Sequence, residues 1–485
     1  MKIIQIHEDD NVVVALEDVK KGEYDALEDI KLGHKLAVKD IEEGEKVIKY
    51  GLPIGKASKS IKKGEWVHVH NMKTGLEEKD EYSYNYTKSS LEKTTPKTFM
   101  GYERKDGRVG IRNEIWIIPT VGCVNGISKT IIERNQHLVK GNIDGLYAFP
   151  HPYGCSQMGD DNENTKRLLA ALVNHPNAGG VLVVGLGCEN VTIESFKKEL
   201  GEWDDNRVKF LICQDSEDEQ EEATKLLEEI AKEADKTART SVSTDKLVIG
   251  MKCGGSDGLS GITANSVVGK FSDLLISQGG STILTEVPEM FGAEAMLMNR
   301  CVNEEVYNKA VDMISGFKDY FVRHGQVVYE NPSPGNKAGG ISTLEDKSCG
   351  CVQKSGSADI MDVIGYGEQV KTKGLTMLDG PGNDLVSSTV LTAAGAHVVL
   401  FTTGRGTPFG CPAPTVKISS NTALFEKHKN WIDFNAGTIA ENKETINEVG
   451  ERLLDFVVDI ANGNKTRTEQ NGYREISILK GGVTL

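Results

Sequence analysis

Between Glu114 and the C-terminus, apolar runs of strand length alternate with segments of helical periodicity. The runs "EIWIIPTVGC", "GLYAFPHPYGC", "GVLVVGLGC" and "VKFLICQ" each precede a helix-like segment, such as "NENTKRLLAALVNHP". Continuous β-branched runs followed by amphipathic helices are typical of parallel strands buried on both faces. A second series starts at "KLVIGMKC" and includes "STILTEVPEM", "LTMLDG" and "AHVVLFTTGRG". The pattern predicts two α/β domains, at residues 99–242 and 243–485.

The pattern before residue 99 is different. Over residues 1–72, short apolar stretches such as "NVVVAL", "EKVIKYG" and "GEWVHVHN" are separated by Gly-containing turns, which indicates a small β-rich domain. Residues 73–98 are polar and lack periodicity, so we interpret them as a linker. The predicted fold class is therefore α/β, with a small β-rich N-terminal domain followed by two α/β domains whose sheets are largely parallel.

Composition narrows the class of protein. A chain of 485 residues is too long for one compact core, and no run approaches about 20 apolar residues, so no membrane span is expected. The net charge of −15 argues against nucleic-acid binding, because phosphate contacts need a basic surface. The N-terminus lacks the features of a signal peptide, so we expect a cytoplasmic protein whose nine cysteines are free thiols or metal ligands. The oligomeric state stays open, and a homo-oligomer is compatible with the sequence.

Three cysteines recur at equivalent places in the first α/β repeat. Cys123, Cys155 and Cys188 each follow a glycine at the end of a predicted strand, 32 and 33 positions apart. The carboxyl ends of parallel strands meet at one sheet edge, where ligands gather. Thiolates select iron, zinc or an iron–sulfur cluster, and three of them leave one coordination position open. The alternative is that each is a small buried residue at a tight strand end.

The segment "FPHPYGCSQMGDDNENT" adds a histidine to this edge. We expect His151 to act as general acid or base, with His7, His34 and Lys337 as further candidates. We expect Asp161 or Asn162 to cap the following helix rather than to take part in the chemistry.

Further polar motifs follow the strands of the second predicted α/β domain. In "MKCGGSDGLSGITAN", glycines allow close backbone approach to a ligand, and in "FTTGRGTP" an arginine lies between two glycines. "ENPSPGNKAGG" has the composition of a surface loop, yet its amides, hydroxyl and lysine suit a carboxylate and hydroxyls. The substrate-binding candidates from these motifs are Ser256, Asp257, Asn331, Ser333, Asn336 and Arg405.

Four of the ten histidines lie in the first 72 residues. His68 and His70 alternate, so we expect both to face one side of a strand, whereas His7 and His34 lie in separate segments. Two interpretations of these histidines remain open. They are exposed surface residues, or they supply a metal ligand or a general base that faces a cleft.

Long motifs spread over the whole chain resemble the altronate/galactarate dehydratase family. "HEDDNVVVAL", "KYGLPIGKA" and "VHVHN" resemble its N-terminal SAF domain, and "YGCSQMGDDNENT", "CGGSDGLSGITAN", "TEVPEMFGAE" and "NPSPGNKAGGISTLEDKS" resemble the rest, in order. Cys349 and Cys411 lie outside the motifs that we associate with the family. The resemblance implies dehydration of D-altronate to 2-dehydro-3-deoxy-D-gluconate in hexuronate catabolism, dependent on Fe2+ with Mn2+ as a substitute.

Two kinds of alternative remain at this point. The same elimination could act on galactarate or sulfolactate, which are substrates of related enzymes. A non-catalytic iron or redox sensor with a sugar-acid-binding module is the alternative from another class. In each case the expected partner is a small sugar acid, with neither nucleic acid nor membrane.

Overall fold

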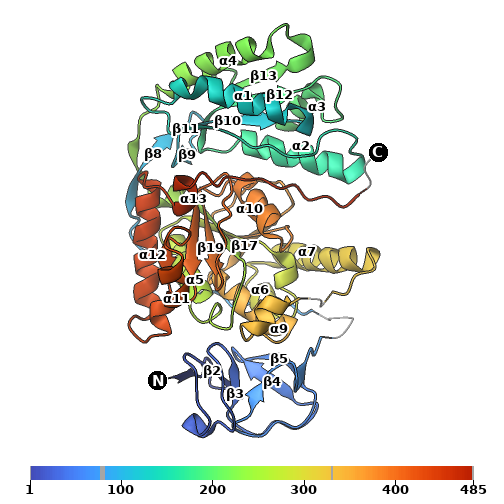
Figure 1. Cartoon of the computed structure of the whole chain (residues 1–485), viewed down its shortest axis with the longest axis vertical. Coiled ribbons are helices and arrows are strands. Elements are labelled where there is room, and N and C mark those ends of the chain that lie inside the picture. The colour runs from blue at the N-terminus through green and yellow to red at the C-terminus, as the bar shows by residue number, and fades with distance from the viewer. Residues whose placement is uncertain (1, 77–81, 329–330, 483–485) are drawn as a thin grey trace.

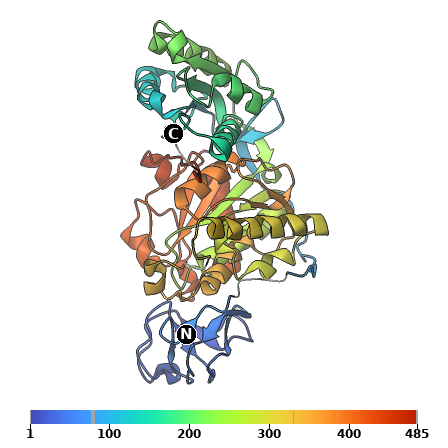
Figure 2. The ribbon, with the colours of Figure 1, turned by 90° about the vertical axis from the view of Figure 1, so that its right-hand side faces the viewer.

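The computed structural model describes residues 2–76, 82–328 and 331–482. Figure 1 shows three regions stacked along the long axis. The N-terminal region (2–76) lies at one end, the second region (98–243) at the other, and the C-terminal region (248–482) between them; Figure 2 shows the same order after a quarter turn. No helix in the described ranges is long and apolar enough to span a membrane.

The N-terminal region consists of short antiparallel strands in two sheets, ordered β1-β2-β3-β6 and β4-β5-β7. Tight turns keep the strands short. Gly64 has φ of +88°, and a Cβ there would lie 2.2 Å from the Asp25 carbonyl oxygen, so only glycine fits this turn. The strands are β1 (Ile3–Ile4), β2 (Val12–Ala15), β3 (Lys35–Ala37), β4 (Lys46–Lys49), β5 (Leu52–Ala57), β6 (Trp66–Val67) and β7 (Met72–Lys73).

The second region is built on a parallel sheet ordered β11-β10-β12-β13, with a small antiparallel sheet β14-β8-β9 beside it. All residues of β10 and β12 are buried, as expected for parallel strands covered by helices on both faces. Its elements are β8 (Thr98–Glu103), β9 (Val109–Gly110), β10 (Glu114–Pro119), α1 (Asn125–Asn135), β11 (Gly145–Ala148), α2 (Gly159–Val173), β12 (Ala178–Gly185), α3 (Ile193–Leu200), β13 (Val208–Ile212), α4 (Glu219–Ala234) and β14 (Thr240–Ser243).

The C-terminal region contains a seven-stranded parallel sheet ordered β17-β18-β16-β15-β19-β20-β21. The α/β fold class predicted from the hydrophobic pattern is thereby confirmed. Its elements are β15 (Val248–Cys253), α5 (Ala264–Ser277), β16 (Ser281–Leu284), α6 (Glu294–Met298), α7 (Glu304–Arg323), α8 (Pro334–Ala338), α9 (Leu344–Cys351), β17 (Ile360–Ile364), β18 (Gly374–Leu378), α10 (Asp384–Ala393), β19 (Val398–Thr403), β20 (Thr415–Ser419), α11 (Thr422–Lys427), β21 (Phe434–Asn435), α12 (Ile446–Ala461) and α13 (Arg467–Gln470).

The polar segment that joins the N-terminal and second regions runs along the C-terminal region. The Tyr84 hydroxyl donates to the Cys301 carbonyl at 2.8 Å, and the Thr87 amide donates to the Asn299 carbonyl at 2.8 Å. The segment is thus held in an extended course by side-chain and backbone bonds to its neighbour, without forming a helix or strand between residues 82 and 97.

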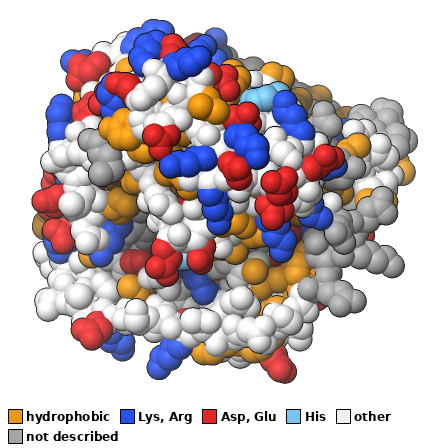
Figure 3. Space-filling view, turned by 90° about the horizontal axis from the view of Figure 1, so that it is seen from below, with side chains coloured by type: hydrophobic (Ala, Val, Ile, Leu, Met, Phe, Trp, Pro, Cys, Tyr) orange, Lys and Arg blue, Asp and Glu red, His pale blue; other side chains and the backbone are white. Residues whose placement is uncertain are grey.

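Buried charges join the N-terminal region to the C-terminal region. The side chains of Lys35 and Asp346 are fully buried and that of Lys49 nearly so, and the two ammonium groups lie 2.7 and 3.1 Å from the Asp346 carboxylate. Lys35 also donates to the Gly340 carbonyl at 2.7 Å. Seen from the N-terminal end, the surface of the molecule carries acidic and basic side chains interspersed (Figure 3). The interface between the N-terminal and C-terminal regions, in contrast, is held together by the buried ion pairs of Asp346 with Lys35 and Lys49.

A buried lysine lies in the sheet of the C-terminal region without an ion-pair partner. Lys252, Phe401 and Lys417 are paired across β15, β19 and β20, and the Lys417 Nζ atom lies 3.3 Å from the centroid of the Phe401 ring. Within the described ranges, this Nζ atom has no hydrogen-bond partner. Burial lowers the pKa of Lys417 to about 7.

Lys417→Met should stabilise the protein below neutral pH. An unfolded lysine has a pKa of about 10.4, so between about pH 7 and 10 the unfolded chain binds a proton that the folded chain releases, and wild-type stability rises with pH across this window. Methionine removes this penalty, and we expect a gain of roughly 1–3 kcal/mol in the free energy of unfolding at pH 6, shrinking towards pH 10. Urea unfolding at both pH values measures it, with the exposed Lys429→Met as control. A loss of stability at pH 6 would contradict the interpretation.

Candidate metal and active site

Two thiols and a carboxylate converge at the carboxyl edge of the seven-stranded sheet. Cys253 is the last residue of β15, Cys351 is the last residue of α9, and Glu289 ends a 3-10 helix that follows β16. The two Sγ atoms are 3.4 Å apart, and the Glu289 Oε2 atom lies 3.2 and 3.0 Å from them. All three residues are buried, and they form the one group of three such side chains within ligand distance among the described residues.

The backbone that delivers these side chains is held by a second carboxylate. Glu286 follows β16 with φ of +71°, a left-handed conformation that non-glycine residues rarely adopt. Its carboxylate accepts a hydrogen bond from the Cys253 amide at 3.0 Å. Strained residues of this kind cluster at functional sites, because the surrounding contacts must hold them in place. The Glu286 turn therefore couples the end of β15 to the loop that carries Glu289.

Two buried lysines compensate the negative charge of this site. The Lys354 Nζ atom lies 2.8 Å from the Cys253 Sγ atom and 3.0 Å from Glu286, and Lys252 lies 2.7 Å from Glu286. Burial alone would lower the pKa of Lys354, but its attraction to Cys253 and Glu286 outweighs burial and raises the pKa well above its usual value. Attraction to Glu286 likewise outweighs burial and raises the pKa of Lys252, so both lysines stay protonated beside the carboxylate and the thiol.

The donor set fits a divalent transition metal. Two sulfurs and one carboxylate oxygen within 3.4 Å of one another can occupy three positions of a tetrahedral ion and leave a fourth for water or substrate. The pKa of Cys351 is raised well above its usual value by its hydrogen bond with Cys253 and by burial, so binding a metal there would release a proton. Soft thiolates favour iron or zinc over magnesium or calcium.

A third lysine joins this group to the loop before α8. The Lys347 Nζ atom lies 2.8 Å from Glu289 Oε1 and 3.1 Å from the Asn331 side-chain oxygen. Its attraction to Glu289 outweighs burial and raises its pKa. We call Cys253, Glu289 and Cys351 the metal-ligand group. Asn331, one of the substrate-binding candidates from the sequence, therefore lies beside it.

The other candidates from the C-terminal region lie together around α8. The Asn336 side-chain amide donates to the Ser256 carbonyl at 2.8 Å, and its oxygen takes part in a capping box with Ser333. The Arg405 guanidinium donates to the Gly335 carbonyl at 3.1 Å from an exposed position. Lys337, on the same helix, is half-buried. The structure thus brings these residues together beside the Cys253 strand end.

Asp257 has a structural task in this cluster. Its buried carboxylate accepts hydrogen bonds from the Ser260 and Ser420 hydroxyls at 2.8 and 2.9 Å and from the Asn421 side-chain amide at 3.2 Å. Burial raises its pKa despite these bonds. Its carboxylate therefore joins the loop after β15 to the loop after β20 at the sheet edge.

Two histidines of the N-terminal region face the C-terminal region. The His68 Nδ1 atom lies 2.8 Å from the Ser342 hydroxyl, and its ring stacks on Trp66 at 5.3 Å. Burial lowers the pKa of His68 to about 4, so the ring is neutral at neutral pH. The His34 Nδ1 atom accepts from the Trp66 ring nitrogen at 3.1 Å, and burial lowers its pKa as well. Both rings are positioned by aromatic contacts at this interface.

The other two N-terminal histidines, His7 and His70, are exposed, unlike His34 and His68. Strand β6 ends at Val67, so His68 and His70 do not share one strand face as the alternation predicted, and His70 is exposed. That expectation was wrong because a turn begins directly after Val67. His7 has a side chain that is 47% exposed and lies 3.5 Å from Asp9. Neither His7 nor His70 contacts the metal-ligand group in any bond recorded for the described residues.

The second region keeps its cysteines and His151 apart from this site. Cys123, Cys155 and Cys188 are exposed on the loops after β10, β11 and β12. The His151 ring is buried, and its two nitrogens lie 2.8 Å from the Pro119 carbonyl and 3.2 Å from the Tyr153 amide. Burial lowers the pKa of His151 to about 4. These two backbone contacts give the ring a structural role in holding the loop.

The acidic pair after this loop also differs from expectation. Helix α2 begins at Gly159 with Met158 as its N-cap, so Asp161 lies inside the first turn and neither it nor Asn162 is the cap. The Asp161 carboxylate instead accepts from the amides of Gly481 and Gly482, at 2.8 Å each. The capping prediction was wrong because the helix starts at least three residues earlier than the sequence indicated, with its cap at Met158 instead of Asp161 or Asn162.

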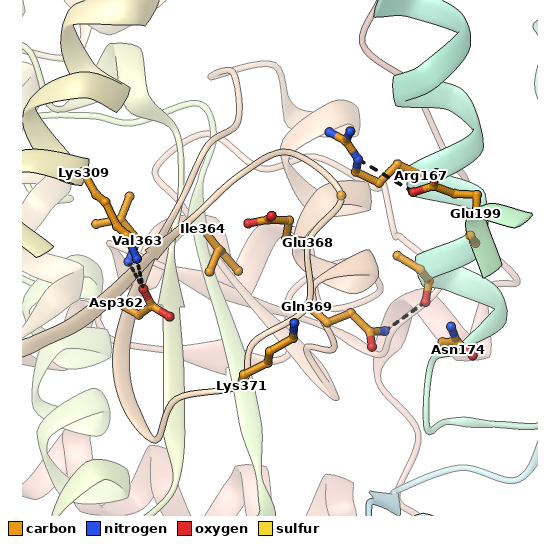
Figure 4. Close-up of a pocket in the computed structure, with 13 residues that line it drawn as sticks. Arg167, Asn174, Glu199, Lys309, Asp362, Val363, Ile364, Glu368, Gln369 and Lys371 are labelled. Carbon is orange, nitrogen blue, oxygen red and sulfur yellow. Dashed lines mark hydrogen bonds and ion pairs between the residues drawn. The ribbon is translucent and has the colours of Figure 1, made fainter. Parts of the chain in front are cut away.

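A surface pocket of about 450 Å3 lies elsewhere, between the second and C-terminal regions. Figure 4 shows two ion pairs among its side chains: Lys309 with Asp362 at 3.5 Å, and Arg167 with Glu199 at 3.9 Å. Because two of its cations are paired with carboxylates and no thiol lines it, this pocket is a poor site for an anionic substrate that needs a metal.

The sequence did not identify the metal-ligand group. Cys253 was visible as a strand-end cysteine in a weak motif, and Glu289 lies in the family-like stretch "TEVPEM", but Cys351 carried no signal of its own. Cys349, the neighbouring thiol that we had left aside, is buried and lies outside the group, and burial raises its pKa to about 12. Of the three members of this group, only Cys253 lies at a strand end, so the recurrence of cysteines at strand ends could have indicated Cys253 but neither Glu289 nor Cys351.

Comparisons with known proteins cover the whole chain. Three family models match in order: "Altronate/galactarate dehydratase SAF domain" at residues 1–75, "D-galactarate dehydratase/Altronate hydrolase, second domain" at 101–235, and "D-galactarate/Altronate dehydratase, C-terminal" at 244–484. Altronate dehydratase of Bacillus subtilis (strain 168) is 52% identical over 99% of each chain, and altronate dehydratase of Escherichia coli (strain K12) is 49% identical over 100% of each. Galactarate dehydratase (L-threo-forming) of Escherichia coli (strain K12) is 34% identical over 87% of this chain and 84% of its own.

Proposed function

The chain belongs to the D-galactarate/altronate dehydratase family, and we propose that it is an altronate dehydratase that converts D-altronate to 2-dehydro-3-deoxy-D-gluconate and water. The preference for altronate over galactarate rests on identities of 52% and 49% with altronate dehydratases, against 34% with the galactarate enzyme. The observation that carries the chemistry is the buried group of Cys253, Glu289 and Cys351 at the sheet edge.

The reaction is demanding at two atoms of the substrate. The C2 proton lies next to a carboxylate and is very weakly acidic, so its removal requires stabilisation of a developing dianion, and the C3 hydroxyl leaves poorly unless it is protonated or polarised. A bound Fe2+, or Mn2+ in its place, would supply a Lewis acid for one of these tasks. Two soft thiolates among its ligands favour iron.

Side chains around the metal-ligand group would hold the substrate and neutralise its negative charge. Lys347 is protonated and bridges Glu289 and Asn331, so it places a positive charge next to the metal-ligand group. The exposed Arg405 and the half-buried Lys337 lie at α8, where they suit a substrate carboxylate. In this arrangement local cations attract the sugar acid against the negative charge of the whole chain.

We assign proton removal to His68. Its ring is neutral at neutral pH, one nitrogen is fixed on Ser342, and stacking on Trp66 holds its plane. His68→Gln should lower kcat by roughly a hundredfold while metal content stays the same. The titration of His68 should leave the wild-type rate constant above about pH 4. The rate should fall below that pH, where the ring becomes protonated and can no longer accept a proton. His70→Gln, on the exposed neighbour, is the control, and an unchanged rate in His68→Gln would exclude His68 as the base.

The proposed function is tested with purified protein, prepared without oxygen and offered three acids separately: D-altronate, galactarate and sulfolactate. We expect 2-keto acid formation from altronate only, loss of turnover on chelation, and recovery with Fe2+. Turnover of another acid in preference to altronate would assign a different member of the family. Absence of any keto acid with iron bound would favour a non-catalytic iron or redox sensor, and full activity in metal-free protein would contradict the metal-assisted reaction.

A further inference from the structure

The second region carries a cluster of thiols that the dehydration chemistry does not use. All nine cysteines lie within the described residues, and the exposed ones are Cys123, Cys155 and Cys188, whereas the others are buried or half-buried. These three follow neighbouring parallel strands in the order β11-β10-β12. Exposure of thiols at a single sheet edge, and nowhere else in the chain, is not explained by core packing.

The sheet register places Cys123 and Cys188 at equivalent positions beyond neighbouring strands. Pro119 of β10 is paired with Val184 of β12, and Cys123 and Cys188 each lie four residues beyond that pair. Cys155 lies on the loop after β11, on the other side of β10. Three loops from three adjacent strands therefore present one thiol each at the same edge.

Hydrogen bonds between the loops hold this arrangement. The Gly122 amide donates to the Tyr153 carbonyl at 2.8 Å, which joins the Cys123 and Cys155 loops. The Asn190 side-chain oxygen accepts from the Ser156 amide at 2.7 Å, and the Asn190 amide donates to the Gly154 carbonyl at 3.1 Å, which joins the Cys155 and Cys188 loops. The cysteines are thus carried on loops fixed against one another.

Polar groups at this edge favour an anionic ligand set. Helices α1, α2 and α3 begin within five residues after the respective cysteines, so three helix N-termini, with their positive dipole ends, follow the thiols. Gln157, two residues after Cys155, is 3% exposed, and its side-chain amide nitrogen has no partner within the described part of the chain. An unpaired buried donor two residues from Cys155 is expected where a ligand accepts its hydrogen bond.

We propose that Cys123, Cys155 and Cys188 bind an iron–sulfur cluster, with one iron left open to solvent. A single tetrahedral ion with metal–sulfur bonds of about 2.3 Å needs sulfurs about 3.8 Å apart. The three sulfurs are not all within 4.8 Å of one another, since the described residues contain one such group and it lies in the C-terminal region. A four-iron cluster spans a wider triangle of thiolates than a single ion. This site does not rest on the proposed dehydration.

The test is anaerobic reconstitution of the full chain with equal amounts of Fe2+ and Fe3+ and one inorganic sulfide per iron. Two ferrous and two ferric ions, four sulfides and three thiolates make the cluster, and the three thiol protons go to solvent, so no further oxidant or reductant is needed. We expect bound acid-labile sulfide, broad visible absorption and, after reduction, an electron paramagnetic resonance signal. Cys123→Ser, Cys155→Ser and Cys188→Ser should each lose the bound sulfide.

The matched control is Cys213→Ser, which changes the half-buried thiol directly after β13, the fourth strand of this sheet. Burial raises the pKa of Cys213 to about 11, so this thiol is not expected to be a ligand. The Cys213→Ser variant should therefore keep the cluster. Sulfide-independent iron at Cys253 and Cys351 should persist in the three variants and shows that they are folded. The proposal is overturned if the wild-type chain binds no labile sulfide, if Cys123, Cys155 and Cys188 bind iron or zinc without sulfide or form a disulfide among themselves instead, or if the three variants keep the sulfide.

Discussion

Cys253→Ser is expected to abolish both metal binding and turnover. The variant replaces a soft anionic ligand with a neutral hydroxyl at a position where the Sγ atom lies within 3.4 Å of the two other donors. It also removes the closer of two partners of the buried Lys354, at 2.8 Å, and leaves Glu286 at 3.0 Å. We expect kcat/KM for altronate to fall on the order of a thousandfold or more, with the sulfide-independent iron close to zero. Metal analysis and steady-state kinetics on the same preparation measure both quantities.

Cys349→Ser is the matched control for this result. Cys349 lies on the same helix as Cys351 and is equally buried, but its side chain is outside the ligand group. The control should keep its iron and its rate. If Cys253→Ser retains both while folded, or if the control loses as much, the group at the sheet edge is not the metal site.

Asp346→Asn should cause the largest loss of stability. The carboxylate compensates Lys35 and Lys49, whose side chains are 0% and 4% exposed, and an amide would leave two buried ammonium groups without a counter-charge. Removing one partner of a buried ion pair costs roughly 3–5 kcal/mol in the free energy of unfolding. Burial lowers the pKa of Lys35 to about 8, whereas attraction to Asp346 outweighs burial and raises that of Lys49. Urea unfolding measures the loss.

The pH dependence of this loss follows from the lowered pKa of Asp346. A carboxyl whose folded pKa lies below its unfolded value of about 3.9 contributes its stability above that pH and loses it as the pH falls further. The difference between wild type and Asp346→Asn should therefore be complete above about pH 4 and shrink below it. Asp40→Asn, which breaks an exposed pair with Lys62, should cost about 1 kcal/mol or less. Equal losses in both variants would contradict the buried-pair account.

The alternating pattern was sufficient to predict the fold class because parallel strands leave a strong local signal. Runs such as Ile115–Ile118 and Val398–Thr403 are continuous, apolar and buried on both faces, and each is followed by a helix or a turn rich in glycine. Strand ends were less predictable. The turn after Val67 separates His68 from His70, and it depends on the hydrogen bond of the His68 amide to the Asn71 side chain, which the alternation cannot reveal.

The metal-ligand group was beyond local patterns for a geometric reason. Glu289 and Cys351 are 36 and 98 positions from Cys253, and they reach it only because a strained turn follows β16 and because α9 ends at the sheet edge. Regular spacing drew attention instead to Cys123, Cys155 and Cys188, whose equivalence follows from repetition of one strand–helix unit. Among the substrate-binding candidates, Ser256 and Asp257 follow β15 and Arg405 follows β19, so strand-end turns made these positions visible in the sequence, and their role in binding stays a prediction.

The most direct test of the account is anomalous diffraction from crystals of the chain grown without oxygen in the presence of Fe2+ and altronate. The account predicts an iron peak about 2.3 Å from the Sγ atoms of Cys253 and Cys351, in contact with Glu289, and altronate between this ion and the α8 loop. Any iron at the three thiols of the second region would give a separate peak. An iron bound instead by the histidines of the N-terminal region, with none between Cys253 and Cys351, would contradict the account.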